Sequence, residues 1–510
     1  TAPQAYVQVS TSGGETVPVL IGLKNAGLLD ISPSGSETLA GSFSASMSLQ
    51  APLWVVPMPG GSPRRLGDLV AQDAAWFPDG QRIVLASASD LYVARRDGSE
   101  ARKLFTAPGR AWRPRISPEG DRIRFTMADP STGVRSLWEV SIEGKNPHPL
   151  LPAWNHPSSE CCGDWTPDGR YYVFQSTRNG RTDIWALRDE RSFLRKPERE
   201  PVQLTTGPLN YWAPLPSRDG KRLYVVGEQP RGELVRYDAK LRQNVPYLSG
   251  ISAEHVRFSR DGAWATYVAF PEGALWRTKL DGSERLQLTF PPMVSSLPRW
   301  SPDGKQIAFA GAEPGQPWKI YLVSADGGTP QSVVPQEPNR TDPDWLADGN
   351  SLIFRDVWRS PDAITGIHLL DLRTHQVSIL PGSEGLWAPR VSPDGRYVVS
   401  LNRDATRLVL LDLTTHRTAD LVSGANVGWP EWSPDSKSVT FWFAERPSSS
   451  FGIFRMRIGD RKLEEVLSLK NVAQRIGRFG PWYGVAPDDS PLMLRDAAIQ
   501  EIYALDVQLP

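Results

Sequence analysis

The chain has two cysteines, and they are neighbours, Cys161 and Cys162. Ordinary disulfides hold their Cα atoms about 4.4–6.8 Å apart, whereas neighbours across a trans peptide lie about 3.8 Å apart. A bond between these two cysteines closes a very small ring and adds almost no loop-closure stabilisation, so it would serve local shape. Two alternatives therefore stay open: a vicinal disulfide that lines a ligand pocket, and two reduced, buried thiols.

The sequence lacks the motifs that mark many enzymes: G-x-S-x-G, H-E-x-x-H, G-x-x-x-x-G-K-[ST] and a strand-linked G-x-G-x-x-G are absent. No two of the six histidines have metal-ligand spacing, so we expect no metal and no cofactor. Each histidine is expected at the surface or within a strand: His148, His156, His255, His368, His375 and His416. Paired carboxylates that hydrolyse glycosides stay open, because Asp and Glu together number 57 and nothing selects one pair.

Aromatic side chains and arginines precede several copies of a short turn motif that contains proline. Aromatic faces with a polar rim suit sugars, peptides or aromatic ligands, and arginine forms paired hydrogen bonds with carboxylate or phosphate. The alternative is structural: the aromatic residues pack between repeats, and the arginines pair with nearby acids. The candidate ligand-binding residues are Trp112, Arg115, Trp212, Arg257, Arg299, Trp387, Arg390, Trp429, Trp482 and Tyr483.

The turn motif, of the form Trp-Ser-Pro-Asp-Gly, recurs eleven times at intervals of 40 to 53 residues. Proline presets the first backbone angle of a turn, Asp can bond its own backbone, and Gly accepts a positive φ without steric cost. The copies are Ile31–Gly35, Trp76–Gly80, Ile116–Gly120, Trp165–Gly169, Pro216–Gly220, Phe258–Gly262, Trp300–Gly304, Trp345–Gly349, Val391–Gly395, Trp432–Ser436 and Val485–Asp489.

The sequence after each motif predicts strands. An alternating apolar segment comes first, and then an aliphatic–aromatic pair such as Ile320-Tyr321 is followed by an Asp-Gly turn. Each repeat of about 45 residues therefore predicts four short antiparallel strands, which make one propeller blade. Propellers usually have about 4–8 blades. The predicted fold is accordingly all-β, with tandem β-propellers built from four-stranded antiparallel blades and about eleven to twelve repeats.

The N-terminus adds half a repeat, because residues 5–19 match the third and fourth strands of a blade that lacks its first two. Counting this half, a division into six and six predicts a first β-propeller at 1–250 and a second at 251–510. The last copy lacks its own final strand. We expect an N-terminal strand to complete it, because such closure removes an exposed sheet edge.

Charge and hydropathy exclude two classes of partner. Lys plus Arg and Asp plus Glu each number 57, so the net charge is zero. This balance argues against nucleic-acid binding, which needs excess positive charge. No run of 18 apolar residues is present, so we expect no membrane span in this chain.

The repeat W-S-P-D-G-K-x-I-A-F…I-Y-x-x-x-x-D-G-G, as it stands at Trp300–Gly328, resembles the TolB-type, WD-repeat-like β-propeller repeat. The whole chain is similar to the C-terminal propeller region of bacterial membrane-bound winged-helix regulator-like proteins. This resemblance implies a periplasmic or extracellular location, in the outer part of a membrane-anchored protein that senses or binds something. The chain contains no winged helix, so the resemblance implies no DNA binding by these residues.

Two classes of function follow. The first is a non-catalytic extracytoplasmic sensor or interaction scaffold that binds a protein or a small molecule at its channel mouths. The alternative is a propeller enzyme that acts on carbohydrate or peptide through carboxylates at a channel mouth. The basic and aromatic segment Lys470–Tyr483 is the expected partner-contacting loop.

Overall fold

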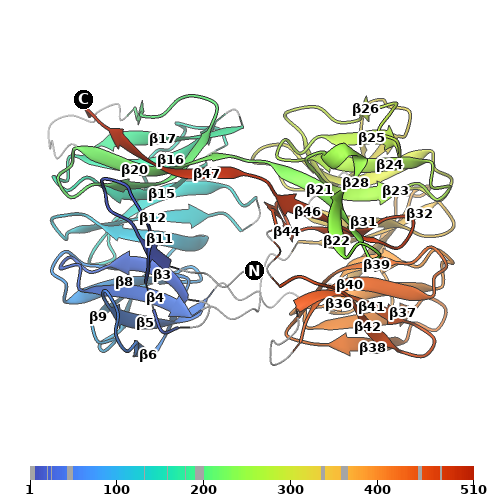
Figure 1. The fold of residues 1–510 in the computed structure, drawn as a ribbon, viewed down its shortest axis with the longest axis horizontal. Coiled ribbons are helices and arrows are strands. Elements are labelled where there is room, and N and C mark those ends of the chain that lie inside the picture. Colours follow the sequence, from blue (N-terminus) through green and yellow to red (C-terminus); the bar gives the residue numbers. More distant parts are fainter. Residues whose placement is uncertain are drawn as a thin grey trace. The chain divides into compact units, whose positions relative to one another are not determined.

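The structure is a computed structural model that describes residues 6–19, 21–23, 26–42, 50–130, 132–157, 159–178, 180–189, 200–334, 339–357, 366–445, 451–470, 472 and 474–509. Its elements are almost all short β-strands, with one 3-10 turn, η1 (Leu248–Gly250) (Figure 1). The strands form antiparallel sheets in which neighbours in sequence are mostly neighbours in space. The all-β fold of tandem propellers predicted from the repeats is therefore confirmed.

The chain divides into two compact units, one of Pro3–Gln229 with Ile499–Pro510 and one containing Pro230–Ala498. We call them the first and the second propeller. Within its described residues, the first contains the hairpin β1 (Tyr6–Gln8) and β2 (Val17–Val19) and five sheets. Its sheets are built from β3 (Ala26–Ile31), β4 (Glu37–Ser42), β5 (Ala51–Pro57), β6 (Arg64–Ala71); β7 (Asp73–Trp76), β8 (Arg82–Ser87), β9 (Asp90–Arg95), β10 (Arg102–Thr106); β11 (Arg110–Ile116), β12 (Arg122–Ala128), β13 (Arg135–Ser141), β14 (His148–Pro149); β15 (Glu160–Trp165), β16 (Tyr171–Arg178), β17 (Arg181–Arg188), β18 (Val202–Gln203); and β19 (Asn210–Pro216), β20 (Arg222–Gln229), β47 (Ile499–Asp506).

The second propeller is built from six four-stranded sheets among the described residues, with the small hairpin β43 (Ile476–Gly477) and β44 (Gly480–Pro481). Its sheets are β23 (Ala253–Phe258), β24 (Trp264–Ala269), β25 (Leu275–Lys279), β26 (Leu286–Gln287); β27 (Val294–Trp300), β28 (Gln306–Ala312), β29 (Lys319–Ser324), β30 (Gln331–Ser332); β31 (Arg340–Trp345), β32 (Ser351–Asp356), β33 (Ile367–Asp371), β34 (Val377–Ile379); β35 (Leu386–Val391), β36 (Tyr397–Asn402), β37 (Arg407–Asp412), β38 (Thr418–Ser423); β39 (Asn426–Trp432), β40 (Ser438–Ala444), β41 (Phe451–Arg457), β42 (Leu463–Ser468); and β45 (Tyr483–Val485), β46 (Pro491–Asp496), β21 (Gly232–Asp238), β22 (Gln243–Pro246).

The repeat motif forms the turn between the first and second strands of a blade. At Trp300–Gly304, Ser301 donates its hydroxyl proton to Asp303 over 2.6 Å, and the same hydroxyl oxygen accepts the Gln306 N–H at 2.9 Å. Gly304 has φ +71° and closes the turn by donating its N–H to the Ser301 carbonyl. This φ lies in the left-handed region, which explains the glycine.

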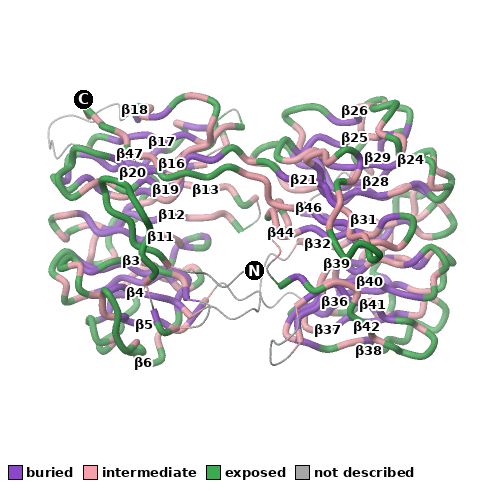
Figure 2. Tube along the Cα trace, in the orientation of Figure 1, coloured by how far each residue is buried: buried purple, intermediate pink, exposed green. Residues whose placement is uncertain are grey.

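Buried side chains line the inner strands of each blade, and exposed residues gather on the outer strands and loops (Figure 2). The recurring motif tryptophans have a second role beyond filling this core. The indole N–H groups of Trp300, Trp345 and Trp432 donate to backbone carbonyls on the preceding inner strands. The acceptors and distances are Arg257 at 3.3 Å, Arg299 at 3.1 Å and Arg390 at 2.9 Å. Each of these tryptophans therefore fastens its blade to the one before it.

One blade of each propeller is completed by a strand from a distant part of the chain. In the first propeller, β47 pairs along its whole length with β20, from Ile499 opposite Gln229 to Asp506 opposite Arg222. In the second propeller, β46 pairs with β21. The chain thus leaves the first propeller after β20, builds the second between β21 and β46, and returns as β47.

The expectation that an N-terminal strand completes the last repeat is wrong. The strand that pairs with β46 is β21. The hairpin β1–β2 instead packs beside β3, where Tyr6 donates its hydroxyl proton to the Ala26 carbonyl. The compact units also change over at Pro230 and at Ile499, whereas the expected boundary stood near residue 250. The reason is that β21 and β22 follow the fifth motif copy in sequence but pair with strands of the eleventh.

The exchange predicts that β47, near the C-terminal end of the chain, stabilises the first propeller. A variant that ends at Ala498 should lower the unfolding temperature of the first propeller by more than about 5 °C, because β20 loses its pairing partner, while the second propeller keeps its own transition. Differential scanning calorimetry measures both transitions. A control that ends at Leu509 keeps β47 and the packed Val507 and Leu509, and should melt as the full chain does; equal melting of the two variants would contradict the assignment.

Candidate functional site

A bulge is repeated in the inner strands at a fixed distance from the motif. Four residues before the motif Ser or its equivalent, the backbone takes a left-handed φ, and the pairing with the second strand shifts there. Left-handed residues other than glycine are uncommon and cluster at functional positions. The residues in this position are Arg113, Cys162, Ala213, His255, Leu297, Asp342, Ala388 and Trp429.

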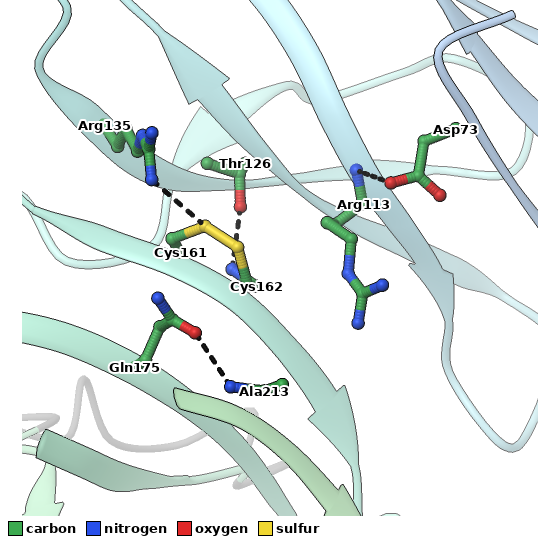
Figure 3. The surroundings of a disulfide bond; sticks show 8 residues. All are labelled: Asp73, Arg113, Thr126, Arg135, Cys161, Cys162, Gln175 and Ala213. Carbon is green, nitrogen blue, oxygen red and sulfur yellow. Dashed lines mark hydrogen bonds between the residues drawn. A yellow bond between two sulfur atoms is a disulfide. The ribbon is translucent and has the colours of Figure 1, made fainter. Parts of the chain in front are cut away.

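The backbone N–H of several bulge residues is bound by a side chain from the preceding blade (Figure 3). Such a bond holds the strained backbone in place and joins two blades. The donors, acceptors and distances are Arg113 to Asp73 at 3.1 Å, Cys162 to Thr126 at 3.0 Å, Ala213 to Gln175 at 3.0 Å and Leu297 to the Nδ1 atom of His255 at 3.4 Å.

Cys161 and Cys162 are bonded to one another at the bulge of β15 in the first propeller (Figure 3). Cys161 is buried and Cys162 is half-buried. The Arg135 Nη1 atom lies 4.0 Å from the Cys161 Sγ atom. Behind the pair, a Cβ on Gly163 would lie 2.4 Å from the Tyr172 ring, so no larger residue fits there without movement. The disulfide alternative is thus the one that the structure contains.

The inner strands of the first propeller also carry opposite charges. The Arg115 Nε atom lies 3.5 Å from Asp164, and burial together with nearby Arg115 governs the pKa values of Asp30 and Asp73. Burial dominates, so both aspartates have raised pKa values. Each accepts two backbone N–H groups, one from its own strand and one from the next blade, and so acts as a fastener between blades.

In the second propeller, three of the predicted arginines converge on one glutamate. Arg257 bonds Glu431, Arg299 reaches both carboxylate oxygens at 3.1 and 3.3 Å, and the Arg390 Nε atom lies 3.6 Å from it. All three arginines are buried. We call these four residues the inner arginine cluster. Its guanidinium groups lie two residues before the motif Ser in three blades, which is the register that brings them together.

The carboxylates around this cluster have unequal environments. Burial by itself would raise the pKa of Asp342, but Arg355 at 2.6 Å and Arg390 at 3.2 Å lower it to about 2. Asp344 has a raised pKa because its burial outweighs the attraction of Arg299 and Arg390. In each of the three cluster arginines, the Nε–H has no hydrogen-bond acceptor among the described residues. Those of Arg390 and Arg299 face carboxylate oxygens at 3.6 and 4.0 Å, too far for a hydrogen bond, so the cluster keeps donors that an added acceptor could use.

The aromatic candidates are divided between the two propellers and differ in burial. Trp112 lies under Arg110 on β11, and Trp212 is half-buried on β19. Trp387 donates to the Asn402 carbonyl over 2.6 Å and lies under Arg355. Three others lie in the second propeller, and two of them meet at His255. Trp429 lies against His255 with ring centroids 5.4 Å apart, Trp482 is 6.4 Å from the same imidazole, and Tyr483 is buried beside Trp442 and Gln474.

Sequence reasoning missed the importance of His255 and Glu254. His255 was expected at the surface or within a strand; it lies in β23 and is 1% exposed, and burial lowers its pKa to about 3. Its Nδ1 atom lies 2.9 Å from the Ser296 hydroxyl. The signal that could have found it is register, because His255 occupies the same place in its repeat as Cys162.

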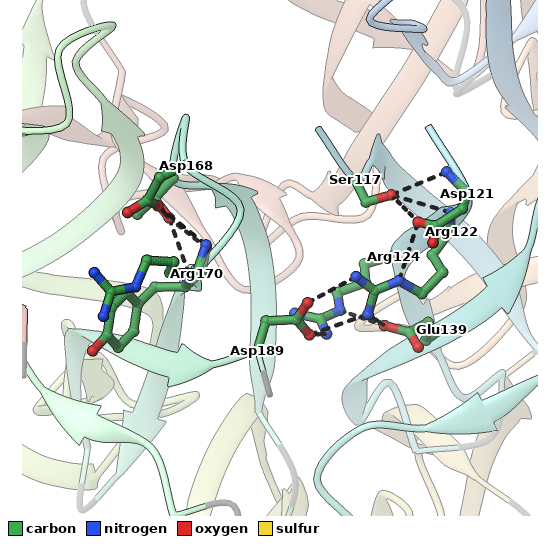
Figure 4. A network of polar contacts seen from close by, with 10 residues as sticks. Ser117, Asp121, Arg122, Arg124, Glu139, Asp168, Arg170 and Asp189 are labelled. Atoms are coloured by element: carbon green, nitrogen blue, oxygen red, sulfur yellow. Dashed lines mark hydrogen bonds and ion pairs between the residues drawn. The ribbon is translucent and has the colours of Figure 1, made fainter. Parts of the chain in front are cut away.

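A second buried polar network joins two blades of the first propeller (Figure 4). The Arg124 side chain is fully buried and donates to Glu139 over 2.7 Å and to Asp189 over 2.6 Å, while Arg122 also donates to Asp189. The Arg124 guanidinium carbon lies 4.0 Å from the centroid of the Trp165 ring. The Arg122 and Arg124 guanidinium groups are paired with Glu139 and Asp189 and shielded from solvent, so this network stabilises the fold.

The residues that the structure describes contain no group of three or more His, Cys, Asp or Glu side chains placed to hold a metal ion. Within the same residues, the structure has no helix of the length and apolar character that a bilayer span requires.

The ion pairs of Asp342 predict acid sensitivity. Its folded pKa lies below its ordinary value near 3.8, so its contribution is present above about pH 4 and is lost as the pH falls toward 2. We expect this loss to be about 2 kcal/mol of unfolding free energy in the second propeller. Urea unfolding at pH 4, 3 and 2 measures it. The Asp342→Asn variant should be less stable at pH 7 and lack this part of the acid dependence; an identical dependence would contradict the assignment.

The disulfide predicts a simple chemical result. Because Cys161 and Cys162 are the chain's two cysteines and are bonded to one another, unreduced protein should show no free thiol after denaturation. Titration with a thiol reagent in guanidinium chloride measures this, and the same sample after reduction serves as the control. Two thiols in the unreduced sample would exclude the bond.

Comparisons with known proteins give partial similarities. No protein-family profile matches the chain. It is 25% identical over 223 residues to the uncharacterized peptidase YuxL of Bacillus subtilis, covering 41% of this chain and 31% of that protein. It is 24% identical over 280 residues to tricorn protease homolog 1 of Streptomyces coelicolor, covering 50% and 24%. The chain thus spans less than a third of either relative. A solved structure of a TolB protein from Agrobacterium tumefaciens, 20% identical, covers 52% of this chain and 99% of that one with a TM-score of 0.42.

Proposed function

We propose that this chain is a non-catalytic, extracytoplasmic binding scaffold whose second propeller binds an anionic group of a polypeptide. The observation that carries the proposal is the inner arginine cluster. Three buried guanidinium groups share one glutamate, and their Nε–H donors have no acceptor among the described residues. Buried donors without acceptors cost free energy, so a bound carboxylate or phosphate that accepts their hydrogen bonds would stabilise the cluster.

The charge balance of the cluster supports an anion over a cation. Counting the ion pairs of the cluster, Arg257, Arg299, Arg390 and Arg355 supply four positive charges, while Glu431, Asp342 and Asp344 supply at most three negative ones. Because burial raises the pKa of Asp344, its negative charge is disfavoured and the positive excess grows. An anion entering this place meets the excess charge in surroundings of low polarity, where the attraction is strong.

A polypeptide is the favoured ligand because the two sequence relatives are described as a peptidase and a protease. The matched region is under a third of each relative, so cleavage does not transfer with it. A propeller that binds peptide without cleaving it accounts for both facts. The half-buried aromatic candidates Trp387 and Trp429 then remain predicted walls of the site.

The extracytoplasmic location is supported by the bonded cysteines. Disulfides persist in oxidising compartments such as the periplasm and are rare in the cytosol, where thiols are kept reduced. Both cysteines of the chain are in the bond. The resemblance of the repeat to TolB-type propellers points the same way.

Binding of hexapeptide libraries with free and with amidated carboxyl ends tests the proposal. We expect the free-carboxylate library to bind better, and Arg299→Met to weaken its binding by at least about tenfold, because methionine keeps the stem and removes the charge. Isothermal titration calorimetry measures both. Arg277→Met is the matched control: it removes a guanidinium of the same propeller that pairs with an exposed Asp326.

Three results would decide against the proposal. Equal binding of the two libraries to the wild type would show that the free carboxylate is not recognised. An equal loss of binding in the Arg277→Met control would show that the inner arginine cluster is not the binding site. If Arg299→Met fails to fold, the comparison of the two libraries on the wild type still decides. Cleavage of the peptides, followed by mass spectrometry, would favour the propeller enzyme instead.

A further inference from the structure

The hairpin β43–β44 lies against one end of the inner strands of the second propeller. Gly477 packs directly on Glu254 of β23: a Cβ at this glycine would lie 1.7 Å from the Glu254 Oε2 atom. Phe479, at the tip, has its ring centroid 5.3 Å from that of Trp318 and 6.4 Å from that of His255. Residues 474–483 of the segment expected to contact a partner are thus folded onto their own propeller.

Beneath the hairpin, Glu254 is only 5% exposed, and its Oε2 atom has no hydrogen-bond partner among the described residues. Burial raises its pKa to about 7, although Arg478 and the N–H of that residue favour the charged form. A glutamate that served only to hold the hairpin would use both oxygens. An unsatisfied carboxyl oxygen at this depth is costly and needs another explanation.

Aromatic rings surround the hairpin tip that covers this carboxyl group. The Arg478 guanidinium carbon lies 5.8 Å from the Trp318 ring centroid, which is within the range of a cation–π contact. Phe479 packs on the same tryptophan, and His255 follows Glu254 in the strand. His255 has its pKa lowered to about 3, so it is neutral at physiological pH and does not repel a cation.

We propose that Glu254 and Trp318 form a binding site for a guanidinium or ammonium group of a ligand, and that the hairpin covers it in the unliganded protein, with the Arg478 guanidinium over the Trp318 ring. A carboxylate beside aromatic faces is the chemistry that recognises such cations. Gly477 allows the hairpin to lie flat on the carboxyl group. A ligand cation displaces Arg478, and the hairpin moves away from the mouth. This site takes the opposite charge to the inner arginine cluster and uses different residues, so it does not rest on the proposed function.

The site predicts a dependence on pH. A bound cation favours ionised Glu254, whereas the unliganded protein keeps this carboxyl largely protonated below its pKa of about 7. Cation affinity should therefore rise as the pH is raised from 6 to 8. The charged group acting on Glu254 from the facing hairpin is Arg478, and from its own strand the neighbour is neutral His255. From β27, the uncharged Ser296 contacts His255.

Argininamide, a small guanidinium compound without a carboxylate, is the probe. We expect Arg478→Ala to bind it at least about tenfold more tightly than the wild type, because the internal competitor is gone. Adding Glu254→Gln to that variant should abolish the gain, and Arg478→Ala alone should bind about tenfold more tightly at pH 8 than at pH 6. Calorimetry measures affinity, and tryptophan fluorescence follows the surroundings of Trp318.

Arg475→Ala is the matched control, because it removes a guanidinium from the same hairpin segment that lies over Phe270 instead. It should bind argininamide as the wild type does. At pH 6 glutamine replaces a carboxyl group that is largely protonated, so the melting temperature at this pH should confirm that the double variant folds. Binding by Arg478→Ala no tighter than by the wild type, or unchanged by Glu254→Gln, would overturn the proposal. The free-carboxylate peptide result does not bear on these outcomes.

Discussion

Hydrogen bonds from the side chains of one inner strand to the backbone of the next are the interaction on which both propellers depend. A blade by itself is a small antiparallel sheet with two faces to cover, and it gains stability only by packing against its neighbours. Trp345 reaches back to the Arg299 carbonyl, and Asp344 accepts the Val391 N–H of the following blade. These bonds fix both the spacing and the register of successive blades, so that residues at equal positions in the repeats meet in the middle.

That register explains why charged and reactive side chains gather at the inner strands. Positions two residues before the motif Ser bring the inner arginine cluster together, and positions four residues before it carry the left-handed bulges with Cys162 and His255. Charges placed there are removed from water, and each must be paired or lose its charge. Asp342, at a bulge, follows the first course, with two arginines and a lowered pKa. Glu254, one residue before the His255 bulge, follows the second, with a raised pKa.

The repeat could be predicted from sequence because its turn chemistry is local. Ser301, Asp303 and Gly304 bond one another within a few residues, so their pattern states the turn directly. The exchange of β21 and β47 could not be predicted. Both strands carry ordinary strand patterns, and nothing local tells a third strand which second strand it will meet. The candidate arginines could be placed at the inner positions by register alone, but their convergence on Glu431 depends on how far each long side chain reaches across the ring.

The exchange has a consequence for how the two propellers are linked. The chain passes between them twice, after Gln229 and before Ile499, and both passages lead directly from one paired strand into another. Opening the β20–β47 pair in one propeller therefore frees an end of the segment that forms β46 in the other. Strand pairing is cooperative, because breaking one hydrogen bond exposes the next to water. A force that separates the two connecting segments is thus resisted by the hydrogen bonds of two sheets. A single flexible linker between separate domains would offer no such resistance.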